Sequence, residues 1–87
     1  MDRVIIIFRN LHTGTEEDLD IPLDITANDL VKALNIGLNL GINTDKVQNC
    51  YLKAENPIVL LRGNRTLADF GIRNGSIINF MPMWETI

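Results

Sequence analysis

The sequence lacks several features that mark common functional classes. It has one cysteine (Cys50) and one histidine (His12), which excludes an internal disulfide framework and a cysteine-based metal or iron–sulfur site. Its net charge of −3 leaves no basic excess for binding nucleic acid. The longest apolar run, Val4 to Phe8, is far shorter than the ~20 residues of a membrane span, and it is not a secretory signal. We therefore expect a cytoplasmic protein that does not insert into a membrane.

The 87 residues suffice for one modest core and are too few for two. A hydrophobic content of 46% with 22% charged residues is typical of a folded globular domain. The sequence thus predicts a single domain over residues 1–87, with residues 82–87 as a short C-terminal tail.

The first third of the chain predicts two strands joined by a turn. Residues 3–9 are β-branched and aromatic, and alternation places Val4, Ile6 and Phe8 toward the core. Residues 18–25 alternate strictly, with Leu and Ile at the odd positions and acids or Pro22 at the even ones. Because proline cannot donate to a ladder and acids discourage pairing, we expect this second strand at a sheet edge.

One helix and two short strands are expected next. Thr26 or Asn28 caps the helix, and Gly41 ends it. Its apolar stripe consists of Leu30, Ala33, Leu34, Gly37 and Leu38. Residues 48–54 and 58–61 then predict a third and a fourth strand, separated by a turn at residues 55–57.

Residues 66–80 predict three features: apolar residues that close one end of the core (the plug), a glycine-containing turn (the corner) and a final strand. Leu67, Phe70 and Ile72 are spaced to close one end of the core. Gly71 and Asn74-Gly75 occupy positions where the chain reverses direction with positive φ. Residues 76–81 form a fifth strand next to the first, and the order ββαβββ predicts an α+β β-grasp fold, a mixed five-stranded sheet with one packed helix.

The chain resembles ubiquitin from Val4 to Met81. Residues 63–72, Gly-Asn-Arg-Thr-Leu-Ala-Asp-Phe-Gly-Ile, carry the most specific similarity, because they resemble the ubiquitin corner. Residues 67–75 and the second-strand motif Asp18-Leu19-Asp20-Ile21-Pro22 resemble the bacterial YukD/EsaB-like proteins, which are associated with type VII (WXG100) secretion. This resemblance implies a cytosolic accessory or regulatory component of such a system, with the secretion machinery among its protein partners.

The end of the sequence departs from the ubiquitin pattern. Ubiquitin and the related sulfur carriers end in Gly-Gly, whereas residues 81–87 read Met-Pro-Met-Trp-Glu-Thr-Ile. Conjugation and sulfur transfer are therefore disfavoured, and a ubiquitin-like modifier or sulfur carrier is kept only as an alternative. A structural homo-oligomer is the other alternative.

No set of residues predicts an enzyme, a metal site or a bound cofactor. His12 lies in an expected turn with no positioned partner. Cys50 is expected to behave as a small buried hydrophobe, and Asp69 to cap backbone N–H groups in the corner. We expect a non-catalytic protein without cofactor.

An apolar patch on the open face of the sheet is the expected protein-binding site. If Val4, Ile6 and Phe8 face the helix, Ile5 and Ile7 face the other way, and the same argument turns Ile77 and Met81 outward. Tyr51 and Lys53 join them from the third strand. A slip of one residue in the first strand would exchange its faces. The patch could also close a homodimer, or be covered by Met83 and Trp84 of the tail.

Overall fold

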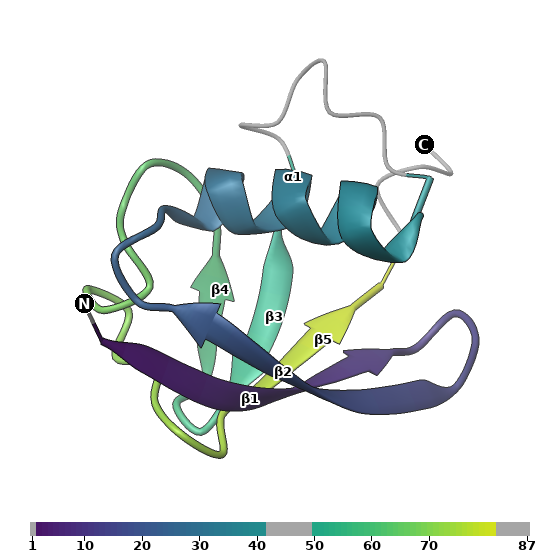
Figure 1. Cartoon of the computed structure of the whole chain (residues 1–87), viewed down its shortest axis with the longest axis horizontal. Helices are drawn as coiled ribbons and strands as arrows, with labels where there is room; N and C mark the ends of the chain where they lie inside the picture. Colours follow the sequence, from purple (N-terminus) through teal and green to yellow (C-terminus); the bar gives the residue numbers. More distant parts are fainter. Residues whose placement is uncertain (1, 42–49, 82–87) are drawn as a thin grey trace.

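The protein forms one mixed sheet with a helix packed on one face. The computed structural model describes residues 2–41 and 50–81. The elements are β1 (Arg3–Asn10), β2 (Thr15–Pro22), α1 (Ala27–Leu38), β3 (Leu52–Glu55), β4 (Val59–Leu61) and β5 (Ile77–Phe80). The strand order across the sheet is β2-β1-β5-β3-β4, and Figure 1 shows α1 lying across the sheet. The predicted ββαβββ order and five-stranded sheet are confirmed.

β5 occupies the middle of the sheet. It pairs in parallel with β1 and antiparallel with β3, so it joins the first hairpin to the β3–β4 pair. Ile78 and Phe80 are buried toward the helix, as the alternation predicts. The prediction that the closing strand lies beside the first strand is therefore confirmed.

The β1–β2 hairpin confirms the predicted faces of β1 and corrects the bounds of β2. Val4, Ile6 and Phe8 are buried, whereas Ile5 is 54% exposed. β2 lies at the sheet edge as expected, but it begins at Thr15 and ends at Pro22 rather than covering residues 18–25. The residues that follow Pro22 leave the ladder, although Leu23 and Ile25 still pack against the core.

Helix α1 begins with a capping box. The Thr26 hydroxyl accepts a hydrogen bond from the Asp29 N–H at 3.1 Å, and the Asp29 carboxylate accepts from the Thr26 N–H. The helix ends at Leu38, because Asn39 adopts the left-handed conformation with φ 53°. The predicted stop at Gly41 was therefore two residues too late: asparagine at residue 39 supplies the turn that was assigned to glycine.

The buried face of α1 differs in part from the predicted stripe. Leu30 and Leu34 are buried as expected, but Ala33 and Gly37 are exposed. Ala27 and Val31 are buried in their place. Successive helix residues are ~100° apart, so the buried stripe is rotated by about one residue from the predicted one. Ala33 and Gly37 are small and weakly hydrophobic, and they therefore define the position of the apolar stripe poorly.

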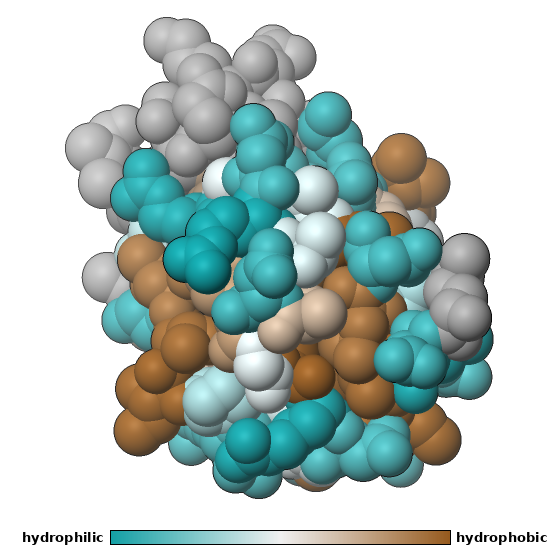
Figure 2. All heavy atoms as spheres, turned by 90° about the vertical axis from the view of Figure 1, so that its left-hand side faces the viewer, coloured by the Kyte–Doolittle hydropathy of each residue, from teal (hydrophilic) through white to brown (hydrophobic). Residues whose placement is uncertain are grey.

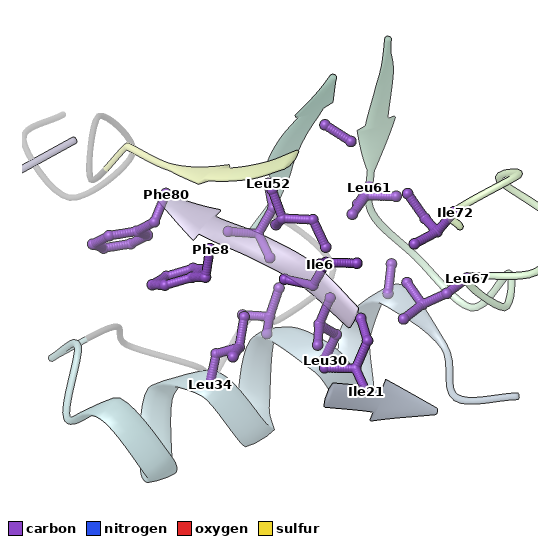
Figure 3. Close-up of a cluster of buried hydrophobic side chains, with 14 of the residues drawn as sticks. Ile6, Phe8, Ile21, Leu30, Leu34, Leu52, Leu61, Leu67, Ile72 and Phe80 are labelled. Atoms are coloured by element: carbon purple, nitrogen blue, oxygen red, sulfur yellow. The ribbon is translucent and has the colours of Figure 1, made fainter. Parts of the chain in front are cut away.

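The core is filled from both ends of the sheet. Figure 3 shows Phe8 and Phe80 beside each other near Leu34 at one end, and Leu67 and Ile72 near Leu61 at the other. Leu67 is completely buried, Ile72 is 3% exposed, and Phe70 packs partly against the core. The predicted plug is confirmed.

The corner before β5 is held by side chains of residues 66, 74 and 76. The Thr66 hydroxyl, rather than the predicted Asp69 carboxylate, caps the turn, since it accepts a hydrogen bond from the Asp69 N–H at 3.2 Å. Gly71 and Gly75 have φ values of +80° and +85°, as expected. The Asn74 side chain accepts a hydrogen bond from the Ile5 N–H at 2.8 Å, which fastens the corner to β1.

The remaining strands are shorter than predicted. β3 begins at Leu52 and continues to Glu55, and residues 48 and 49 of the predicted strand lie outside the described residues. β4 begins at Val59, and β5 covers Ile77–Phe80 rather than residues 76–81. The buried Ser76 hydroxyl instead donates to the Asn56 carbonyl at 2.7 Å, which holds the β3–β4 turn against the corner.

We expect Leu67→Ala to lower the free energy of unfolding by about 3 kcal/mol, because it removes a fully buried side chain from the closed end of the core. Ile36→Ala is the matched control, since Ile36 is 83% exposed on α1 and its truncation should change the free energy by no more than about 0.5 kcal/mol. Urea denaturation followed by circular dichroism measures both. Equal losses for the two variants would contradict the role of the plug.

Candidate functional site

The sheet face opposite α1 is organised in two rows of side chains that cross the strands. Strand alternation directs every second side chain to this open face. The registers align residues of neighbouring strands, so each row can be followed from β2 toward β4. These rows are the framework in which the predicted binding residues lie.

The first row is apolar at its centre and acidic at both ends. Ile7 of β1 pairs with Ile77 of β5, and the row continues to Asp18 on β2 and to Glu55 on β3. Ile7 and Ile77 are half-buried, and Ile5 lies two residues before Ile7 on β1. Ile5, Ile7 and Ile77 therefore form an apolar strip, which we call the β1 strip.

The second row is mainly polar. It consists of Glu16 on β2, Arg9 on β1, Asn79 on β5, Lys53 on β3 and Leu60 on β4. Nε of Arg9 lies 2.8 Å from Glu16 Oε2, and Nη1 of Arg9 lies 3.3 Å from Glu55 Oε2. Arg9 thus bridges β2 and β3 over the central strand. Because both carboxylates are about half exposed, these ion pairs orient side chains more than they stabilise the fold.

Asn79 is the buried polar residue of the open face. It is 6% exposed, and its Nδ2 donates to the Lys53 carbonyl at 3.2 Å and to Glu55 Oε2 at 2.8 Å. Its Oδ1 is buried, and no residue in the described part of the chain forms a hydrogen bond with it. Since both neighbours of Nδ2 are acceptors, only the amide nitrogen can face them.

Sequence reasoning missed Asn79 as part of the site. Its position two residues after Ile77 indicates the open face, but the sequence analysis did not include it among the binding residues. Its burial depends on Arg9 and Glu55 of the two neighbouring strands, which the local pattern does not reveal.

The structure places the six predicted site residues on the open face or at its border, but not in one patch. Ile5, Ile7 and Ile77 form the β1 strip. Lys53 is exposed within the second row, and Tyr51 and Met81 are half-buried and precede β3 and follow β5, respectively. The polar row of Arg9, Asn79 and Lys53 therefore separates Tyr51 and Met81 from the isoleucines. Met83 and Trp84, expected as possible cover, lie outside the described residues.

A shallow hollow of about 500 Å³ lies over the β3–β4 side of the open face. It is lined by Lys53, Ala54, Glu55, Ile58, Val59, Leu60 and Asn79. Ile58, in the turn before β4, is 90% exposed, and Leu60 is 42% exposed. The hollow thus adds exposed apolar surface that the sequence analysis did not include in the patch.

Figure 2 shows the molecule from the side on which the N-terminus lies in Figure 1. Apolar side chains there form separate groups between hydrophilic ones. On this side of the molecule the exposed apolar surface is therefore divided into limited areas.

The candidate reactive residues occupy ordinary positions. Cys50 is 3% exposed, in accordance with its expected role as a buried hydrophobe, and His12 is exposed in the β1–β2 turn. Within residues 2–41 and 50–81, no three His, Cys, Asp or Glu side chains are grouped to hold a metal ion. In the same part of the chain, no helix is long and apolar enough to cross a membrane.

We expect Asn79→Asp to lower the free energy of unfolding by about 3 kcal/mol at pH 7. The substitution replaces the Nδ2 donor with a carboxylate oxygen, which would face the Lys53 carbonyl and Glu55 without a proton to share. Asn74→Asp is the matched control, because the Asn74 side chain accepts from the Ile5 N–H and a carboxylate can do the same. Its effect should stay within about 0.5 kcal/mol in urea denaturation; a similar loss in both variants would contradict the donor role of Asn79.

Several solved structures share this fold. The ubiquitin-like domain of Plasmodium falciparum Dsk2 is 19% identical with a TM-score of 0.60, and the match covers 90% of this chain and 97% of that one. The C-terminal ubiquitin-like domain of mouse tubulin-specific chaperone e is 12% identical with a TM-score of 0.67, covering 90% and 84%. A protein designed de novo on the basis of ubiquitin is 17% identical with a TM-score of 0.64, covering 88% and 84%. The fold is therefore ubiquitin-like, as predicted.

The family relationship rests on sequence. Comparison with curated proteins finds no match. The family described as "WXG100 protein secretion system (Wss), protein YukD" matches residues 4–79, from the second residue of β1 to the third residue of β5. The match spans nearly all of the described elements and confirms the resemblance noted in the sequence, so the chain belongs to the YukD family of the WXG100 protein secretion system.

Proposed function

We propose that this protein is a non-catalytic, non-conjugated ubiquitin-like module that docks to other proteins through the open face of its sheet. In this proposal it acts in the cytoplasm as an accessory or regulatory component of a type VII secretion system. The observation that carries the proposal is the β1 strip, where Ile5 is 54% exposed beside the half-buried Ile7 and Ile77. The proposed docking surface is centred on Ile5, Ile7 and Ile77 and extends across the polar row to Lys53, Tyr51 and Met81.

The surroundings of the β1 strip support a docking role. Ion pairs border it: Arg3 Nε lies 2.9 Å from Asp20 Oδ1 beside Ile5, and Arg9 bridges Glu16 and Glu55 beyond Ile7. An apolar centre within a polar rim is the usual arrangement of a protein–protein interface. A partner that covers the strip would remove apolar surface from water without breaking these ion pairs.

The charge beside the strip favours a partner with basic residues. Asp18 pairs in register with Ile7, its side chain is exposed, and no described residue forms an ion pair with it. The Asp18 carboxylate at this border would orient a basic partner surface and raise its association rate.

We expect Ile5→Lys to weaken binding to the partner at least about tenfold, because it places a charge at the most exposed residue of the strip. The assay is titration calorimetry against purified cytoplasmic domains of the secretion machinery from the same bacterium. Ile36→Lys is the control: it introduces the same charge at an exposed isoleucine on α1, on the other side of the sheet, and should bind like the parent protein.

Two outcomes would contradict the proposal in different ways. Equal weakening by both variants, or by neither, would remove the docking site from the β1 strip. Absence of specific binding by the parent protein to every domain tested would contradict the docking function itself. Circular dichroism of each variant establishes that a loss of binding is not a loss of fold.

A further inference from the structure

Four side chains on the β3–β4 side of the open face form a rectangular array that is complementary to itself. Lys53 of β3 pairs in register with Leu60 of β4, and Ala54 pairs with Val59. One step further along both strands, Glu55 lies at the end of β3 and Ile58 immediately precedes β4. Strand alternation places Lys53, Glu55 and Leu60 on the open face. Ile58, two residues before Leu60, lines the hollow of about 500 Å³ together with them. We call Lys53, Glu55, Ile58 and Leu60 the β3–β4 array.

A single rotation pairs every member of the array with a suitable partner. Consider a two-fold axis parallel to the sheet, perpendicular to the strands, that passes over the Ala54–Val59 pair. It brings a second copy face to face with the first and places Lys53 of one copy over Glu55 of the other, twice. The same rotation places Ile58 over Leu60, also twice. We propose that the β3–β4 array is a homodimer contact of this geometry, in which Ile58 of each copy enters the hollow of the other.

The charged groups of the array are available for such a contact. The exposed Lys53 side chain forms no ion pair with any described residue. Glu55 uses Oε2 to accept from Asn79 Nδ2 and from Arg9, whereas the described residues donate no hydrogen bond to its Oε1. Asn79 and Arg9 therefore hold the Glu55 carboxylate in place with one oxygen left for Lys53 of the second copy. A preorganised carboxylate loses little side-chain entropy on pairing.

The exposure of Ile58 also favours a second copy as the occupant. Ile58 is 90% exposed and lines an apolar hollow, so it can insert into the hollow of another copy and also contact the residue that inserts into its own. Two-fold symmetry requires a surface that matches itself, and a projection next to a recess meets this requirement. A different protein would need the same alternation of charge and apolar groups on its own surface.

The size of the array predicts a weak dimer. Only four side chains of each copy make matched contacts, fewer than the roughly 20–30 residues a side of a standard interface, so the dimer should form and dissociate with concentration. The same rotation lays β5 over β5 and β1 over β1 of the second copy, so Ile77 of one copy lies opposite Asn79 of the other. Self-association therefore goes beyond the proposed docking function and competes with it for the open face, and the two are tested by variants at different residues.

The test is sedimentation velocity of the full chain over a range of concentrations. The parent protein should shift from monomer toward dimer as its concentration rises. Lys53→Glu and Glu55→Lys should each require at least about tenfold higher concentration, because each variant places like charges opposite one another in both contacts. An equimolar mixture of the two variants should associate like the parent, since every contact then joins a Glu to a Lys.

A second pair of variants tests the apolar half of the array without altering Arg9 or Asn79. Ile58→Asp should reduce dimer formation by the same factor, whereas Ile36→Asp, an equal change at an exposed isoleucine of α1, should not. A parent protein that remains monomeric at every concentration would overturn the proposal and leave the hollow to another partner. A dimer that is insensitive to Ile58→Asp, or variants at residues 53 and 55 that fail to associate on mixing although both are folded, would also overturn it.

Discussion

The insertion of β5 between β1 and β3 is the constraint on which the rest of the structure depends. Residues 77–80 close the sheet by joining a hairpin from the start of the chain to a strand pair from its second half. One face of β5 carries Ile78 and Phe80 into the core, and burial of side chains of this size stabilises a fold by about 2–3 kcal/mol each. Its other face places Ile77 and Asn79 in the two rows of the open face. A single short strand thus supplies both the centre of the core and the centre of the candidate binding surface.

Asn79 connects these two roles. It lies in the middle of the sheet, and its amide hydrogens are shared between the backbone of β3 and the Glu55 carboxylate. Glu55 in turn accepts from Arg9 of β1. The network spans three strands by side chains in addition to the backbone ladders, and it engages Oε2 of Glu55 while the described residues donate no hydrogen bond to Oε1. The polar centre of the open face therefore determines the orientation of the groups at its border.

Features of the fold that depend on local periodicity could be predicted from the sequence, whereas features that depend on contacts between distant residues could not. Alternation in residues 3–9 was sufficient to separate Val4 and Ile6 from Ile5 and Ile7, because a buried face requires one register. The end of α1 was misplaced because Asn39 and Gly41 both accept the left-handed conformation, and local sequence does not decide between them. The β1 strip could likewise be predicted, since neighbouring strands with known alternation determine it.

The interruption of the predicted patch had a different origin. It arises because Arg9, Asn79 and Lys53 come into register from three strands, and 70 residues separate the first two along the chain. A local stretch of sequence does not show that these three residues become neighbours. The same is true of the hollow, which exists because the turn before β4 places Ile58 next to residues of β3.

The division of the open face has a consequence for its use. In the first row Ile77 lies directly beside Glu55, so the border between the β1 strip and the β3–β4 array is a single interstrand step. A partner on the β1 strip would occupy the space that β1 and β5 of a second copy take in the proposed dimer, so the module would bind such a partner as a monomer. A partner that extends past Ile77 would cover Glu55 and exclude the second copy. Because Lys53 belongs to both proposed surfaces, a partner that uses Lys53 competes with self-association, and the concentration of the protein then sets how much of it is free to dock.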